Sequence, residues 1–126
     1  MKYEKLKIAL LAGHNISFIF EPYLCYHTHK EANHIMVTGR QCIENYMIYK
    51  NTDSIESIAF STQHLTITNN IKPVIEISKY VIRNTELADV TIKVYFLSPL
   101  DYSFLKEPLI FEGQLGNGFK FFVRSD

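Results

Sequence analysis

Apolar side chains alternate with more polar ones between residues 90 and 97. The apolar positions are Val90, Ile92, Val94 and Phe96, and the positions between them are Thr91, Lys93 and Tyr95. Successive side chains of a β-strand project to opposite faces, so this pattern predicts a strand with one buried face. Similar runs recur along the chain and predict roughly nine or ten short strands. We therefore expect a mainly β protein with one or two short helices, built as an antiparallel β-sandwich or small open barrel, with an α+β fold as the alternative.

The N-terminal part of the chain contains several of these short runs. Residues 5–11 alternate like a strand, although a short amphipathic helix fits the same residues because several are good helix formers. Residues 13–15, Gly-His-Asn, predict a turn. A strand is expected over residues 16–20 and stops at Pro22, and residues 23–29 are expected to continue extended.

Residues 40–60 fit both kinds of secondary structure. Two pairs have the spacing of a helix-capping box, namely Thr38 with Gln41 and Asp53 with Glu56. That spacing favours a helix or helical turn somewhere between residues 40 and 60. The apolar residues of the same stretch also fit a strand.

The C-terminal half shows clearer patterns. A proline opens the long β-branched run of residues 73–83, where its missing N–H does little harm. Ser98 followed by Pro99 has the pattern of a helix N-cap and predicts one or two helical turns through Lys106. Residues 116–118, Gly-Asn-Gly, separate two alternating runs and predict a β-hairpin.

Composition limits the classes of function. The chain has 126 residues, which suits a single domain over residues 1–126. Thirteen basic residues balance thirteen acidic ones. This balance argues against binding of duplex nucleic acid, which normally requires a basic surface, but it is compatible with a nucleotide-sized ligand.

Cys25 and Cys42 are the two cysteines of the chain, which is too few for a disulfide framework. The apolar run near the N-terminus is shorter than a secretory leader requires, and no run approaches the length of a membrane-spanning helix. We therefore expect a cytoplasmic protein with both thiols reduced and no membrane association.

Histidines are concentrated between Cys25 and Gly39, where His27, His29 and His34 lie close together in sequence. Two histidines separated by one residue on a strand face the same way and can bind one divalent metal as neutral imidazoles. His34 could add a third ligand across a turn. The alternative is a set of surface histidines on a solvated strand and turn.

The same residues resemble a motif of the cupin superfamily. His27-Thr28-His29, followed by His34 and Gly39, is similar to the first cupin motif, although histidine stands where glutamate is usual. Tyr80 with Asn84 resembles the end of the second motif, with tyrosine at the histidine position. The His-Thr-His-Lys sequence further resembles cupin-type isomerases and epimerases that act on nucleotide-linked sugars.

The cupin resemblance implies a barrel whose interior holds a small ligand or a divalent metal. His27 and His29 would act as general bases there, and Tyr80 would donate or accept a proton. Arg40 or Arg83 could anchor an anionic group, with Asn84 beside it, although each arginine is also an ordinary solvated surface residue.

A second class of function is a non-enzymatic binding protein. A toxin-immunity protein, or a phage-encoded inhibitor or sequestering protein, would fit the small size and the outward-facing aromatic residues predicted by strand alternation. Its partner would be a protein or a nucleotide-sized ligand. Exposed strand edges recruit partners, so we also expect a homodimer or larger assembly.

Overall fold

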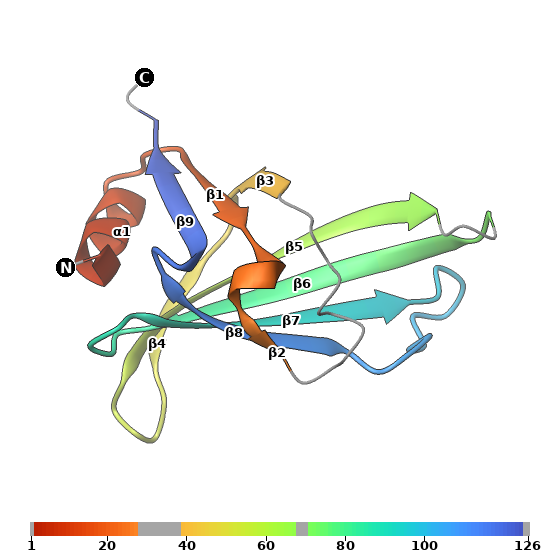
Figure 1. Cartoon of the computed structure of the whole chain (residues 1–126). Coiled ribbons are helices and arrows are strands. Elements are labelled where there is room, and N and C mark those ends of the chain that lie inside the picture. Colours follow the sequence, from red (N-terminus) through yellow and green to blue (C-terminus); the bar gives the residue numbers. More distant parts are fainter. Residues whose placement is uncertain (1, 28–38, 68–70, 125–126) are drawn as a thin grey trace.

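The computed structural model describes residues 2–27, 39–67 and 71–124 (Figure 1). Within these ranges the chain forms nine strands, one α-helix and one 3-10 helix. In chain order the elements are α1 (Lys2–Leu11), β1 (Ile16–Phe20), η1 (Pro22–Leu24), β2 (Tyr26–His27), β3 (Gly39–Cys42), β4 (Met47–Lys50), β5 (Glu56–Ile67), β6 (Pro73–Arg83), β7 (Asp89–Leu97), β8 (Leu109–Leu115) and β9 (Gly118–Val123). All nine strands belong to one sheet in the order β3-β1-β9-β8-β7-β6-β5-β4, with β2 paired to β8.

The sheet curls into a half-barrel. Strands β5 to β8 run side by side as antiparallel neighbours, and β1 and β9 lie across them (Figure 1). Phe18 on β1 and Phe60 on β5 are far apart in the strand order, yet their ring centroids are 5.1 Å apart. The two ends of the sheet therefore approach each other across a shared core, and the expected mainly β open barrel is confirmed.

Strand β7 shows how the sequence pattern selects the inner face. Val90, Ile92 and Val94 are buried, whereas Lys93 between them is exposed. Ile92 lies opposite Tyr80 on β6 and Phe111 on β8, so one buried row crosses three strands. Cross-strand neighbours on one face stabilise a sheet by direct side-chain packing.

Helix α1 covers one end of the half-barrel. Its buried residues are Tyr3, Leu6, Ala9 and Leu10. The strand expected over residues 5–11 was wrong and the helical alternative was right. A strand would bury Ile8 together with Leu6 and Leu10, but Ile8 is 64% exposed, because a helix carries it to the other side. Within the described chain, no helix is long and apolar enough to cross a membrane.

Glu56 connects α1 to the start of β5. Its Oε1 accepts a hydrogen bond from the Tyr3 hydroxyl at 3.0 Å and lies 2.9 Å from Lys7 Nζ. The bond from Lys7, and then that from Tyr3, lowers the pKa of the Glu56 carboxyl. The carboxylate therefore contributes to stability only while it is ionised.

The Glu56 contacts predict a pH-dependent loss of stability. A group whose pKa is lowered by folding stabilises the fold above its unfolded pKa, and that stability is lost as the pH falls through the folded pKa. Glu56→Gln should therefore unfold at lower urea concentration than the wild type at pH 7, and the gap should close at acidic pH. Urea titrations across this pH range test the effect. Glu107→Gln, on an exposed side chain, should show no such gap.

The helix expected between residues 40 and 60 was wrong. Strands β3 and β4 and the start of β5 occupy this stretch. Asp53 makes no helix cap: its Oδ1 accepts a hydrogen bond from the Ile55 N–H at 3.0 Å, within the turn between β4 and β5. Asp and Asn side chains bond to nearby backbone in turns as readily as at helix N-caps, so the capping-box spacing was ambiguous. Thr38 lies outside the described residues.

Residues 98–106 form turns rather than the expected helix. The Ser98 hydroxyl accepts a hydrogen bond from the Leu100 N–H at 3.2 Å, and Asp101 accepts one from the Ser103 N–H at 3.0 Å. Tyr102, between them, has a positive φ of 61°, which does not occur within a right-handed helix. The polar residues that suggested a helix N-cap stabilise local turns instead.

The hairpin expected around residues 116–118 was also wrong. Gln114 and Asn117 exchange two backbone hydrogen bonds, of 3.1 and 2.8 Å, which turn the chain tightly. Gly118, with φ of 91°, then redirects it. Strand β9 leaves β8 after two parallel pairs and forms an antiparallel ladder with β1. The turn chemistry was predicted correctly, but the partner strand was not.

Candidate ligand-binding hollow

The concave side of the half-barrel encloses a hollow of about 400 Å³. Its apolar wall consists mainly of aromatic rings: Phe18 and Phe20 from β1, Tyr80 from β6, Phe96 from β7 and Phe111 from β8. These strands are held in place by the sheet ladder and not by loops. Their side chains face inward because they occupy alternate positions of each strand.

The rings pack against one another as well as against the hollow. The Phe18 and Tyr80 rings meet edge to face with centroids 4.9 Å apart, and Phe20 meets Phe111 in the same way at 5.2 Å. Phe60 stacks on Tyr80 at 4.9 Å. Rings in these arrangements attract each other beyond the effect of burial. Contacts among its own rings therefore hold the wall of the hollow in place.

The part of the hollow's wall that β5 and β6 form also carries a polar pair, His64 and Glu76. His64 on β5 is directly opposite Glu76 on β6, and His64 Nε2 is 3.5 Å from a Glu76 carboxylate oxygen. Both side chains are partly exposed, at 46% and 28%. Ser78 and Gln41 add an alcohol and an amide to the lining. The hollow thus combines an apolar wall with a few groups that can bind a polar substituent.

Tyr80 keeps its proton in this setting. The side chain is buried, with 2% exposure. Burial raises the pKa of its hydroxyl, and the neighbouring hydroxyls of Thr62 and Ser78 offset part of that rise. The phenol is therefore protonated at neutral pH. Of the two roles expected for it, proton donor and proton acceptor, the environment favours the donor.

The predicted metal ligands lie mostly beyond the described chain. His29 and His34 are outside it, and of His27 only the backbone is described, as the last residue of β2 opposite Phe111. Among the described residues, no group of three or more His, Cys, Asp or Glu side chains could hold a metal ion. A divalent metal bound by the three histidines stays a prediction, to be checked by metal analysis of the purified protein.

The other predicted ligand residues do not meet at one site. Arg40 on β3 donates a hydrogen bond from Nε to Ser17 Oγ at 3.1 Å, and its guanidinium carbon lies 5.0 Å from the Phe122 ring centroid. This stacking partly covers the outward-facing ring that the sequence predicted. Arg40 is thus placed on the outer side of the sheet, whereas Tyr80 faces the hollow.

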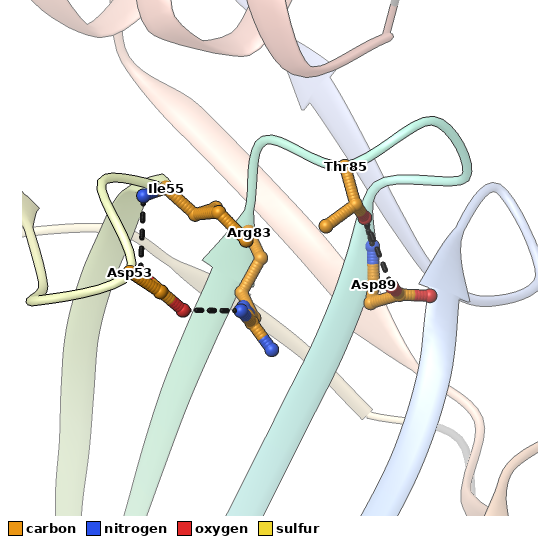
Figure 2. A network of polar contacts seen from close by, with 5 residues as sticks. All are labelled: Asp53, Ile55, Arg83, Thr85 and Asp89. Carbon is orange, nitrogen blue, oxygen red and sulfur yellow. Dashed lines mark hydrogen bonds and ion pairs between the residues drawn. The ribbon is translucent and has the colours of Figure 1, made fainter.

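Arg83 and Asn84 lie at the end of β6. Figure 2 shows the Arg83 guanidinium directed at Asp53, with Nη2 2.8 Å from the carboxylate, and Thr85 directed at Asp89. The Asn84 N–H donates to the Glu56 carbonyl at 2.8 Å. Arg83 and Tyr80 occupy positions of opposite parity on β6 and therefore face opposite sides. These contacts connect neighbouring strands and turns.

The two cysteines are free and differently placed. Cys25 is buried and Cys42 is exposed, so they form no disulfide with each other. Burial, and then the charge of Glu21, raises the pKa of the Cys25 thiol to about 11. At neutral pH this thiol is protonated, which makes it a poor nucleophile.

Sequence reasoning missed His64 and Glu76. Both lie in runs that were correctly predicted as strands, and each occupies an inward-facing position by alternation. Only the pairing of β5 with β6 shows that they are opposite each other. Alternation with Leu65 and Ile67 would have put His64 on the solvent face, whereas those two apolar side chains are each 66% exposed. The register between two strands also cannot be read from either strand alone.

Fold and site together define a mainly β half-barrel protein with an aromatic-lined hollow. Residues 1–102 match the family model described as VirK protein, so the chain belongs to the VirK family. The crystal structure of a VirK family protein from Legionella pneumophila has a similar fold, with a TM-score of 0.76 and 20% sequence identity over 95% of this chain and 94% of that chain. No curated protein matches the sequence.

The VirK match overturns the resemblance to cupins. The match covers the residues on which that resemblance rested, from His27 to Asn84, and identifies a different family. The motif residues also differ in their surroundings. Tyr80 packs within the aromatic wall, whereas Asn84 lies beyond the end of β6. Short pairs such as His-x-His or Tyr-x-x-x-Asn carry little information without the fold around them.

Proposed function

We propose that this VirK family chain is a non-enzymatic binding protein whose hollow holds a small ligand with an apolar part. The observation that carries the proposal is the preformed aromatic wall around about 400 Å³, a volume typical of small-molecule sites. Apolar burial would supply most of the affinity. His64, Glu76 and the Tyr80 hydroxyl would bind a polar substituent and orient the ligand.

The chemistry of the lining supports binding more than catalysis. The raised pKa of Tyr80 keeps its hydroxyl protonated, so this residue binds through its proton and does not remove one. The side chains of His64 and Glu76 are 46% and 28% exposed, so the polar end of the hollow is open to solvent. General-base catalysis usually relies on a group that is shielded from solvent. The hollow fits recognition of a ligand better than conversion of one.

Filling the hollow should abolish binding of an apolar probe. We expect the wild type to bind anilinonaphthalene sulfonate at one site, and Ser78→Leu to weaken that binding by at least about tenfold, because the larger side chain occupies the hollow. Fluorescence titration measures the affinity.

Thr91→Leu is the matched control, since it makes a comparable substitution on β7 at a position that faces the opposite side of the sheet. It should leave the affinity unchanged. If Ser78→Leu folds and binds the probe as tightly as the wild type, the probe binds elsewhere and the proposal is wrong.

A further inference from the structure

The half-barrel is open along a seam between β3 and the second half of β5. A slot of about 430 Å³ lies there. Its lining is mostly polar and comes from both walls and from the link between β3 and β4: Gln41, Cys42, Glu44, Asn45, and residues 61–63. Glu44 is the charged residue among them. The slot therefore lies between two strands, β3 on one side and β5 on the other.

Among the described residues, the second half of β5 has a paired neighbour only on its β6 side. β4 pairs with β5 only from Glu56 to Ala59, and within the described residues no strand continues that pairing from Phe60 to Ile67. The Asn84 N–H donates to the Glu56 carbonyl, so even-numbered residues of β5 direct their backbone groups toward β6. In the second half of β5, the odd-numbered residues therefore direct their N–H and C=O groups into the seam.

The β5 edge lacks the usual protection against strand addition. Natural edges are interrupted by prolines, bulges or charged side chains. Residues 60–67 read Phe-Ser-Thr-Gln-His-Leu-Thr-Ile, without proline, lysine or acidic residues. Their pairing to β6 is also free of bulges. This stretch is a regular template for one more strand.

Apolar pockets flank the slot on both faces of the sheet. On the concave side, Gln41 lines both the slot and the aromatic hollow. On the convex side, Asn45 and Ser61 line both the slot and a groove of about 440 Å³. The apolar residues of this convex groove include Tyr46, Met47, Ile77 and Tyr95. A strand in the slot would direct alternate side chains into these two pockets.

We propose that the seam binds an extended segment of a partner polypeptide as an additional β-strand. Backbone bonds to Ser61, Gln63 and Leu65 would supply affinity, and the two pockets would select apolar side chains at alternate positions. The concave pocket is the hollow of the proposed function, so this inference rests on it in part. Glu44 favours a basic residue at the end of the segment near β4.

The geometry favours a single segment over a second copy of this chain. A strand in the slot has β3 on one side and β5 on the other. An edge strand of a second copy would bring its own sheet and would meet β3. A free or loop-borne segment carries no such neighbour. Dimerisation through this edge would instead appear as protection that depends on protein concentration.

A proline on the β5 edge tests the inference. The probes are fluorescein-labelled seven-residue peptides with lysine at both ends and valine, leucine or phenylalanine at alternate positions. Gln63→Pro removes an N–H that faces the seam and not β6, so the fold should persist. We expect Gln63→Pro to weaken peptide binding by at least about tenfold in fluorescence anisotropy, whereas Gln63→Ala binds within about twofold of the wild type.

Two further measurements separate backbone pairing from other modes of binding. Peptides N-methylated at every residue have no N–H on either edge of the strand, so they cannot pair and should not bind. Bound peptide should slow hydrogen exchange at the Ser61 and Leu65 amides. The inference is overturned if no peptide of the panel binds the wild type, if Gln63→Pro binds like Gln63→Ala, or if those amides are protected only by concentration-dependent dimerisation.

The dye titration keeps the two proposals distinguishable. Gln63→Pro should still bind anilinonaphthalene sulfonate, because the hollow is intact. Dye binding without peptide binding overturns the strand-addition inference alone. Peptide binding that depends on Gln63, in a protein whose dye affinity is insensitive to Ser78→Leu, overturns the small-ligand function and leaves strand addition standing.

Discussion

Phe18→Ala should lower the free energy of unfolding by about 3–5 kcal/mol, the usual loss for a buried phenylalanine truncated to alanine. Phe18 is 1% exposed. Its ring meets Tyr80 at 4.9 Å and stacks on Phe119 at 5.2 Å, in addition to its contact with Phe60. Among the described rings, we expect the loss of Phe18 to lower stability most, because its contacts with Phe60 and Tyr80 join β1 to the long strands β5 and β6 across the core.

Urea denaturation followed by circular dichroism measures this loss. Phe104→Ala is the control, since Phe104 is 65% exposed and its ring contacts Tyr95 at a centroid distance of 5.8 Å. It should lose less than about 1 kcal/mol. If Phe18→Ala is too unstable to purify, Phe18→Leu should still fall well below the Phe104 variant. Equal losses at the two positions would mean that β1 does not close onto β5.

The sequence was most informative where one strand face is buried and the other solvated. The alternation around Val90 and Ile92 predicted β7 correctly, and a proline followed by β-branched residues predicted β6. These patterns depend on a local property, the side to which each residue points. The mainly β class follows from many such local patterns and needed no knowledge of pairing, but these patterns left a sandwich and an open barrel as alternatives.

Predictions failed where the outcome depends on distant contacts. Residues 5–11 fit a strand by alternation, and they form a helix because Tyr3, Leu6 and Leu10 together cover the end of the half-barrel. In the same way, an Asn-Gly turn fixes how tightly the chain reverses but not which strand follows it. Here β1 competes successfully for β9, over a five-residue antiparallel ladder.

The candidate site was predictable only in part. Tyr80 was singled out from the sequence and does line the hollow, but for a reason, the cupin resemblance, that proved wrong. Arg40 and Arg83 were singled out for their charge, and each is bound to a neighbouring strand or turn. The hollow itself is a product of curvature, which strand patterns do not encode. The two polar residues of the hollow, His64 and Glu76, lie opposite each other only because of the register between β5 and β6.

Gly118→Ala should destabilise the fold more than any other glycine substitution at a turn, by about 2–4 kcal/mol. Two effects combine at this position. Gly118 has a positive φ of 91°, which an alanine adopts only with strain. An added Cβ would also lie 2.5 Å from Cys25 Sγ, too close for any real contact. Thermal or urea unfolding of the purified variant measures the loss.

Gly13→Ala separates the two effects. Gly13 also has a positive φ, of 79°, but nothing lies within 4 Å of the Cβ that alanine would add. Its loss should therefore be the backbone strain alone, about 1 kcal/mol. The difference between the two variants then measures the collision with Cys25.

The collision can be relieved in a double variant. Cys25→Ala removes the sulfur, and the next atoms around the added Cβ of residue 118 are backbone atoms of Leu24 at 3.6 Å and beyond. Gly118→Ala should therefore cost less in the Cys25→Ala background than in the wild type, with a coupling energy of about 1 kcal/mol or more. Additive losses, or equal losses for Gly13→Ala and Gly118→Ala, would show that Cys25 does not pack on the turn. The chain would then take a different route from β8 into β9, because the present route is what brings Gly118 against the buried Cys25 thiol.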